Sequence, residues 1–372
     1  MRTVIVADDL TGAADSVVAF AGAAVALDPE NAWPDACVVA ADTDSRYAPP
    51  EVARARVRAA VRRAERAGAR VVKKIDSTLR GHVAAEVAAA AEALGARLVV
   101  VAPAFPATGR TTLGGVVHVD GRPLPERRHG GDVAALLGEA GMRVRTMGLA
   151  QLREPGLDAR FAQTGGVIVC DGETDADLDA VAAAVPEGAL LVGSGGVTAA
   201  LAGRARAPRA VRAKSGPSLV VVGSYSDLAR SQRLALIEAG WTPVTLRPDG
   251  PGPDEAGKAV RDALTRGDVV LSVDPDAPVD RSRAFATARA LAQAAAAAAP
   301  DAAVLAATGG ETARAVLAAL GASELRPVGE PEPGVVASRV PGTDALFVTK
   351  AGAFGDRETL ARVLRAVSDQ EE

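Results

Sequence analysis

Aromatic residues are scarce in this 372-residue chain, at 3% of the sequence. So few rings argue against the stacking platforms on which proteins bind single-stranded nucleic acid. The net charge of −4 also lacks the basic footprint of a DNA- or RNA-binding protein. The arginine-rich stretch at 54–70 has helical spacing and is interpreted as a solvated helix face. We therefore expect no nucleic-acid partner.

Cysteine and histidine are also rare. The two cysteines, Cys37 and Cys170, stand beside valines, so we expect both to be small buried residues in a reducing compartment. The three histidines, His82, His118 and His129, are scattered and give no zinc-ligand spacing. The sequence therefore predicts no side chains that ligate a structural metal ion.

Long hydrophobic runs are missing as well. No stretch of about 18 apolar residues occurs without charge, glycine or proline, apart from alanine runs. The N-terminus lacks a basic start followed by an apolar core, so no signal peptide is predicted. We expect a cytoplasmic protein with no membrane partner.

Short β-branched runs alternate with longer alanine-rich stretches, which is typical of parallel α/β organisation. The stretch at 103–130 is rich in turn residues and is expected to carry a local β excursion. In the first half, strands are expected at 3–7, 36–41, 70–75, 97–102, 166–171 and 189–194, and helices at 12–26, 50–67, 82–94, 130–140 and 175–185.

Residues 204–217 interrupt this alternation with two prolines, a glycine and several basic residues, and we interpret them as a linker. The predicted fold is two α/β domains with mostly parallel sheets, residues 1–205 and 216–372, and a cleft between them. In the second half, strands are expected at 218–223, 242–246, 268–273, 302–307, 334–340 and 345–349, and helices at 226–239, 254–266, 281–298, 311–320 and 356–367.

Polar residues gather where the predicted strands of the first half end, and ligands of open α/β sheets bind at such ends. Carboxylates beside cations suit an anionic, hydroxylated small molecule, whose carboxylate an arginine would grip with two hydrogen bonds. Two alternatives are that Asp9 caps the next helix and that the charges form an ion-pair network. The residues concerned are Asp8, Asp9, Asp42, Asp44, Arg46, Lys73, Lys74, Asp76, Ser77, Thr78 and Arg80.

Glycines follow three predicted strands of the second half, at Gly223-Ser224, at Gly309 to Thr312, and at Lys350-Ala351-Gly352. Such turns let backbone N–H groups reach a phosphate at a helix N-terminus, although tight turns need glycine in any case. No P-loop pattern occurs, and GSGG at 193–196 falls short of a dinucleotide fingerprint. The sequence thus favours a phosphate site of another kind.

Eight motifs in order, over nearly the whole chain, resemble the four-carbon acid sugar kinase family. The resemblance implies an ATP-dependent kinase that phosphorylates erythronate, threonate or 3-oxo-tetronate at the terminal hydroxyl. It also implies that the N-terminal domain binds the sugar acid and the C-terminal domain binds ATP. The motifs are VIVADDLTGAADS, DTDSR, KKIDSTLRGHVAAE, PAFPATGRTTLGG, VCDGETDADL, VVGSYSDLARSQ, ATGGETARAVL and VTKAGAFG.

The resemblance also implies roles for single residues. Substrate contacts would come from Asp8 or Asp9, Arg46, Lys74, Asp76, Ser77, Thr78 and Arg80, and nucleotide contacts from Ser224, Gly309, Gly310, Glu311, Thr312 and Gly352. We hypothesise that Asp9 or Asp76 accepts the proton of the attacking hydroxyl and that Mg²⁺ bridges the phosphates. Glu311 would orient Mg²⁺-bound water or a ribose hydroxyl. Lys350 would neutralise phosphate charge or else be an exposed helix-cap lysine.

Two other functions remain open. A metal-dependent aldolase or isomerase would use the strand-end aspartates as ligands. A catalytically degenerate sensor of sugar acids and nucleotides is favoured by Ala353, which stands where the family often has glycine. The sequence does not choose among the three acids, and residues 103–131 are a candidate homodimer interface.

Overall fold

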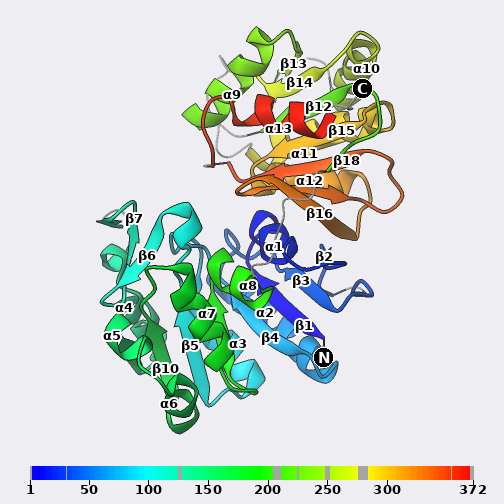
Figure 1. The fold of residues 1–372 in the computed structure, drawn as a ribbon. Coiled ribbons are helices and arrows are strands. Elements are labelled where there is room, and N and C mark those ends of the chain that lie inside the picture. The colour runs from blue at the N-terminus through cyan, green and yellow to red at the C-terminus, as the bar shows by residue number, and fades with distance from the viewer. Residues whose placement is uncertain are drawn as a thin grey trace. The chain divides into compact units, whose positions relative to one another are not determined.

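The computed structural model describes residues 2–30, 32–124, 128–203, 211–223, 226–247, 252–274, 284–352 and 354–368. The chain divides into two compact units, Met1–Arg206 and Ala207–Glu372, which we call the N-terminal and C-terminal units. Most of the predicted linker, residues 204–210, lies outside the described ranges. Helices and strands alternate in both units, which confirms the predicted α/β class (Figure 1).

The N-terminal unit is built on a parallel sheet. Its strands are almost continuously apolar because helices cover both faces, as expected for a parallel sheet. The strand order is β2 (Ala24–Ala26), β3 (Val38–Asp42), β1 (Thr3–Ala7), β4 (Arg70–Lys74), β11 (Leu190–Gly193), β5 (Leu98–Ala102), β10 (Gly166–Cys170) and β9 (Val144–Met147).

Successive side chains of these strands point to opposite faces of the sheet and pack into two hydrophobic cores. Val99 and Val101 pack with one group of helices, and Leu98 and Val100 pack with the other. The first group is α2 (Pro50–Arg66), α3 (Val83–Leu94) and α4 (Val133–Gly138). The second is α1 (Leu10–Val17), α5 (Leu149–Leu152), α6 (Leu157–Gln163), α7 (Asp175–Ala184) and α8 (Gly195–Leu201).

A small antiparallel sheet follows β5 and confirms the predicted β excursion. Asp171 ties its first turn to β10, because its two carboxylate oxygens accept from the N–H groups of Gly114 and Gly115 at 2.8 Å each. The strands are β6 (Arg110–Leu113), β7 (Val116–Val119) and β8 (Arg122–Pro123), flanked by short 3-10 helices at Pro106–Thr108 and Arg128–Gly131.

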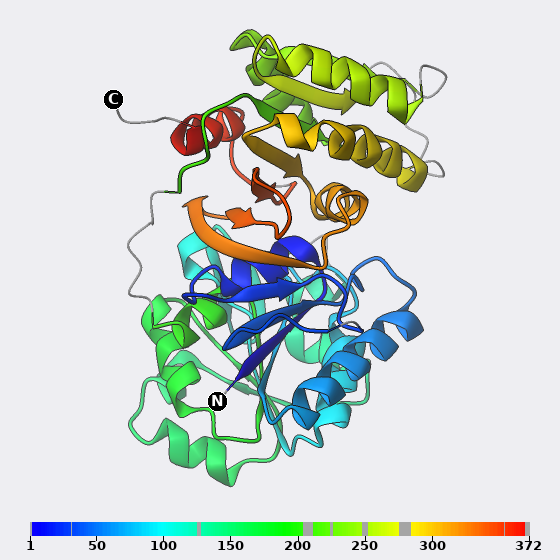
Figure 2. The ribbon, with the colours of Figure 1, turned by 90° about the vertical axis from the view of Figure 1, so that its right-hand side faces the viewer.

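The C-terminal unit has a mostly parallel sheet with an antiparallel edge. The order is β13 (Thr242–Leu246), β14 (Val269–Val273), β12 (Ser218–Val222), β15 (Val304–Thr308), β18 (Leu346–Lys350), β17 (Val335–Arg339) and β16 (Glu324–Glu332), of which the first five are parallel. Helix α9 (Asp227–Glu238) packs with α13 (Thr359–Ser368). Helices α10 (Pro253–Leu264), α11 (Ala284–Ala298) and α12 (Gly310–Ala319) pack side by side, and a 3-10 turn at Ala299–Asp301 follows α11 (Figures 1 and 2).

Two local expectations are wrong, and a strand was not predicted. The helix expected over 12–26 ends at Val17, and after a turn at Gly22, whose φ is +69°, the chain forms β2. Strand β16 was not anticipated because Pro327, Gly329 and Pro331 are poor strand residues, tolerated here on an irregular antiparallel strand. Cys37 is exposed, whereas Cys170 is buried as expected.

No helix in the described ranges is both long and apolar enough to cross a membrane.

Candidate functional site

The carboxyl ends of β1, β3 and β4 lie level in the N-terminal unit, since Ala7 pairs with Asp42 and Val6 with Lys73. The polar residues that follow these strands therefore meet at one edge of the sheet, as the sequence predicts. We call this edge the acidic rim and define it as residues 8–11, 42–46 and 74–80.

Arg46 is the centre of the acidic rim. Its Nε and Nη2 donate to the two carboxylate oxygens of Asp8 at 2.7 and 2.9 Å, and its Nη1 lies 2.7 Å from Oδ2 of Asp9. Burial disfavours the charged guanidinium, but Asp8 and Asp9 outweigh burial and raise the pKa of Arg46. All three guanidinium nitrogens are thus occupied by carboxylates, so binding of a substrate carboxylate by Arg46 stays a prediction that requires the cluster to rearrange.

Asp9 is the N-cap of α1, which was the structural alternative to a catalytic role. Its Oδ1 accepts from the N–H of Gly12 at 3.0 Å, and its Oδ2 accepts from the hydroxyl of Thr11 at 2.7 Å. Its side chain is 15% exposed, against 3% for Asp8. Burial raises the pKa of Asp9, although the charge of Arg46 opposes this. An accessible carboxylate with a raised pKa can both cap the helix and accept a proton.

Asp76 organises the turn after β4. Its Oδ1 accepts from the N–H and hydroxyl of Thr78 at 2.9 and 2.6 Å and from the N–H of Arg80, while its Oδ2 accepts from Nη2 of Arg80 at 2.6 Å. Burial alone would raise the pKa of Asp76, but the hydrogen bond from Arg80 and the charge of Arg46 lower it far below its usual range. A carboxylate so strongly held in its ionised form is a poor proton acceptor.

The two adjacent lysines of β4 have different surroundings. Lys73 is fully buried and lies 2.9 Å from Glu86 of α3. Lys74 lies against the start of α1, where a Cβ on Gly12 would be 3.4 Å from its Nζ, and donates to the carbonyl of Ile75 at 3.1 Å. An ammonium group has three donors, so Lys74 retains the capacity to bind an anion, whereas Lys73 is committed to the core.

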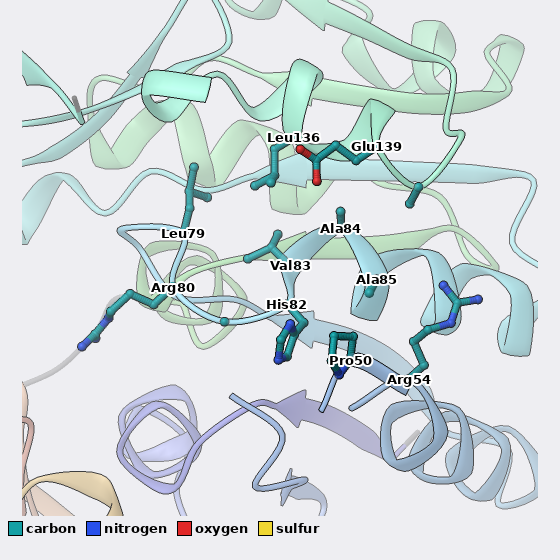
Figure 3. Close-up of a pocket in the computed structure, with 12 residues that line it drawn as sticks. Pro50, Arg54, Leu79, Arg80, His82, Val83, Ala84, Ala85, Leu136 and Glu139 are labelled. Atoms are coloured by element: carbon teal, nitrogen blue, oxygen red, sulfur yellow. The ribbon is translucent and has the colours of Figure 1, made fainter. Parts of the chain in front are cut away.

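The loop that contains Leu79 to Gly81 separates the carboxylates of the acidic rim from a groove of about 590 Å³. Val83 and Leu136 point into it, while Arg80 extends away from its centre (Figure 3). The loop therefore has an apolar face toward the groove and a polar face toward the acidic rim.

The three glycine turns of the C-terminal unit follow neighbouring parallel strands, β12, β15 and β18. The N–H of Gly309 donates to the carbonyl of Lys350 at 2.8 Å, which joins two of the turns. A Cβ on Gly223 would lie 2.2 Å from the hydroxyl of Thr312, so only glycine allows the end of β12 to approach α12 this closely. Ser224 lies outside the described residues.

The start of α12 is the feature that best fits a phosphate. Its N-cap, Gly309, has a φ of +87° and offers no side chain, so no side chain caps the first turn. By contrast, α1 is capped by Asp9 and α7 by Thr174. The amide donors and positive dipole end of α12 are thus left for an anion, beside Glu311, which is exposed.

Lys350 is buried, so the alternative of an exposed helix-cap lysine is wrong. Its Nζ donates to the carbonyls of Ala351 and Phe354 at 2.8 and 2.7 Å and so closes the last glycine turn. Gly352 is half-buried in that turn, and Ala353 lies outside the described residues. Burial lowers the pKa of Lys350 to about 8.

We expect the unfolding free energy of the protein, relative to a Lys350→Met variant, to rise as the pH rises from about 8 to 10.5. In this window the unfolded lysine, with its ordinary pKa of 10.5, still binds a proton that the folded lysine has released. The gap between 10.5 and about 8 corresponds to ~3 kcal/mol. Urea unfolding at several pH values measures it, with the exposed Lys258→Met as the control. A flat difference would contradict the lowered pKa.

Sequence reasoning missed Glu86, whereas GSGG, which falls short of a dinucleotide fingerprint in the sequence, has a packing role. Glu86 shares the buried face of α3 with Val83 and Val87, so a charged residue at a core position of an alanine-rich helix was the available signal. The GSGG glycines allow close packing: a Cβ on Gly193 would lie 2.6 Å from the Ala102 carbonyl, and one on Gly196 would lie 2.5 Å from that of Ala104.

The rim aspartates do not form a metal site of the kind that an aldolase would need. In the described part of the chain, no three or more His, Cys, Asp and Glu side chains are grouped to hold a metal ion. Asp8, Asp9 and Asp76 instead accept hydrogen bonds from arginines and from turn residues. Carboxylates that already accept hydrogen bonds from arginines and turn residues suit a polar site whose charge is balanced by cations rather than a site for a divalent ion.

Two known families match this chain, and the boundary between the two matches falls where the structure divides the chain into its N-terminal and C-terminal units. Residues 3–201 match the family described as the sugar-binding N-terminal domain, and residues 219–360 match the nucleotide-binding C-terminal domain. A D-threonate kinase of Cupriavidus necator is 39% identical, and the match covers 99% of each chain. A D-threonate kinase of Bordetella bronchiseptica is 38% identical, covering 98% of this chain and 97% of the relative.

The fold is shared with more distant solved structures. A Salmonella typhimurium protein aligns with a TM-score of 0.81 at 21% identity, over 99% of this chain and 100% of its own. A Haemophilus influenzae protein aligns with a TM-score of 0.73 at 19% identity, over 97% and 99%. At such identities these structures speak to the fold alone.

Proposed function

Because this chain belongs to the four-carbon acid sugar kinase family, we propose that it transfers the γ-phosphoryl group of ATP to the terminal hydroxyl of a four-carbon sugar acid. Residues 1–205 would bind the acid and residues 216–372 the nucleotide. The observation that carries the proposal is that one unit has a charged rim and the other unit, taken by itself, has an uncapped helix start beside glycine turns. The relatives named D-threonate kinase make D-threonate the first substrate to test, ahead of erythronate and 3-oxo-tetronate.

On the acid side, we assign binding of the substrate carboxylate to Lys74 and Arg80. Lys74 has spare donors, and Nε of Arg80 has no hydrogen-bond partner among the described residues. Ser77 is half-buried beside them and would contact a substrate hydroxyl, and Asp8 would hold Arg46 in place. Thr78 and Asp76 would shape the turn through their mutual hydrogen bonds.

We assign the proton acceptor to Asp9 rather than Asp76. Both were candidates from the sequence, but Asp76 is held by four donors, and its lowered pKa opposes proton uptake. Asp9 is more exposed, and burial raises its pKa toward the working pH. Asp9 would take the proton of the terminal hydroxyl as that oxygen attacks phosphorus.

On the nucleotide side, the amides at Gly310, Glu311 and Thr312 would bind the phosphates, and Gly352 would approach them from the next turn. Mg²⁺, which neutralises phosphate charge when bound, needs hard oxygen ligands. Glu311 is an exposed carboxylate here, and the hydroxyl of Thr308 has no hydrogen-bond partner among the described residues, so both fit such an ion. Lys350 would hold the last turn rather than contact phosphate directly.

A coupled assay of ADP release with ATP, Mg²⁺ and each of the three acids tests the proposal. We expect turnover that requires both substrates, and phosphorus NMR should show the product as a phosphate ester of the terminal hydroxyl. ADP binding and thermal protection by the acid without turnover would favour the sensor. Cleavage or isomerisation of the acid without ATP would favour the aldolase or isomerase class.

We expect Gly310→Val to weaken ADP binding by at least about tenfold, because a branched side chain at the first residue of α12 would fill the space where a phosphate approaches the amides. Isothermal titration of the full chain with ADP measures the change. Gly252→Val is the control, since Gly252 is the N-cap of α10 in the same unit and a Cβ there meets nothing within 4 Å. Equal ADP affinity in both variants would remove α12 from the site.

A further inference from the structure

A buried ion pair lies beside the acidic rim and has no part in the proposed chemistry. Nζ of Lys73 is 2.9 Å from Oε2 of Glu86, and the two side chains are 0% and 2% exposed. Lys73 also donates to the carbonyls of Val6 and Lys74, so the pair links α3 to β1 and β4. Apolar residues often replace such a pair without loss of stability, so stability alone does not account for it.

The second oxygen of Glu86 continues this network toward the rim. Oε1 accepts from the hydroxyl of Ser45 at 2.7 Å; that hydroxyl is 2.7 Å from the hydroxyl of Thr43, which lies 2.8 Å from the carbonyl of Ala7. The hydroxyl groups of Ser45 and Thr43 together supply two hydrogens for these three contacts. The charged carboxylate of Glu86 is the strongest acceptor, so the hydroxyl of Ser45 donates to it. Ser45 and Thr43 are buried.

The turn that Ser45 fixes is the one that carries Arg46. The N–H groups of Ser45 and Arg46 both donate to the carbonyl of Asp8, at 2.9 and 3.1 Å. Within the turn, Asp44 has a φ of +47°, in the left-handed region that aspartate tolerates better than most residues, and its N–H donates to Oδ1 of Asp42 at 3.0 Å. The hydroxyl of Ser45 therefore helps to set where the backbone of Arg46 lies.

We propose that Ser45 and Glu86 are positioning residues of the kinase, which hold the Arg46 guanidinium against Asp8 and Asp9 through the turn at 43–46. This inference rests on the proposed function, because it serves the same rim. The charge of Arg46 opposes protonation of Asp9, so a displaced Arg46 would let Asp9 bind its proton more tightly. The other charged groups near Asp9, which are Asp8 and Lys74, would stay in place.

Ser45→Ala in the full chain is the decisive variant. We expect kcat/KM for D-threonate to fall by about tenfold or more, because small misplacements of catalytic groups cost this much. The acidic limb of its pH profile should move to higher pH, while KM for ATP stays within about twofold. Glu86→Gln keeps an oxygen that can accept from Ser45 but leaves buried Lys73 without its counter-charge, so we expect smaller kinetic changes together with a clearly lower melting temperature.

A double-mutant cycle separates positioning from a general loss of stability. In an Arg46→Lys background the guanidinium is already gone, so adding Ser45→Ala should cost less than about twofold more. Ser218→Ala is the matched control, because it also removes a buried hydroxyl, at the start of β12. It should lower the melting temperature without moving the pH profile.

The outcomes distinguish this inference from the proposed function. If the unmodified protein turns over none of the acids, the proposed function fails. If it is active, while Ser45→Ala changes only the melting temperature and is additive with Arg46→Lys, the network is structural and the positioning role is overturned.

Discussion

Asp9→Asn is expected to lower kcat for the sugar acid by about a hundredfold or more, the range that a positioned base contributes. Asparagine is as good an N-cap as aspartate, so its side-chain oxygen still accepts from Gly12 and α1 keeps its start. The Oδ2 atom that accepts from Thr11 and lies 2.7 Å from Nη1 of Arg46 becomes an NH2 group, so we expect a lower melting temperature beside the loss of proton transfer. Steady-state kinetics at saturating ATP, with a melting curve for each protein, measure both quantities.

Asp132→Asn is the matched control for this test. Asp132 is the N-cap of α4 in the same unit and accepts from the N–H of Ala135 at 2.9 Å, so the variant makes the same chemical change at an equivalent structural position. We expect its kcat to match that of the unmodified protein. Near-normal turnover of Asp9→Asn would reject Asp9 as the base.

Arg46→Ala is expected to destabilise the N-terminal unit by about 3–5 kcal/mol, because it leaves the buried carboxylates of Asp8 and Asp9 without their counter-charge. Activity should fall for this reason as well as through lost alignment of Asp9. A rise in KM would therefore not by itself show that Arg46 binds the substrate. Urea unfolding decides whether the variant has lost stability.

Arg153→Ala provides the comparison. Arg153 pairs with Asp177 at 2.8 Å, but its side chain is 48% exposed, against 6% for Arg46, so water screens its charge and its removal should destabilise the unit less than removal of Arg46. If Arg46→Ala were as stable as Arg153→Ala and only raised KM for the acid, Arg46 would bind the substrate carboxylate directly, as the sequence predicts.

The positions of the site residues could be predicted because buried parallel strands appear as short apolar runs that end abruptly. The ends of β1, β4 and β15 were visible in this way, and they place Asp8, Asp76 and Gly309 at sheet edges. The β excursion after β5 was visible from its turn residues. Strand β2 was hidden because its alanines resemble a continuing helix.

An ion-pair network was one of the alternatives, and Asp76 pairs with the nearby Arg80, but the other partners of the charged residues could not be predicted because they depend on distances between strands. Arg46 reaches Asp8 from 38 residues away, and nothing local shows that its guanidinium is fully occupied. For Lys73 and Lys74 a signal existed: neighbouring residues of a strand point to opposite faces, so the two lysines cannot share one environment. The buried face of α3 then supplies Glu86 as the partner of Lys73.

The contrast between the two thiols gives this chain a built-in probe of partial unfolding. Burial raises the pKa of Cys170 to about 12, which keeps the thiol unreactive while the N-terminal unit is folded, whereas Cys37 is exposed and open to alkylation. Residues 207–372 contain no cysteine. Once Cys37 has been blocked, the rate at which a maleimide modifies Cys170 reports the opening of the N-terminal unit alone.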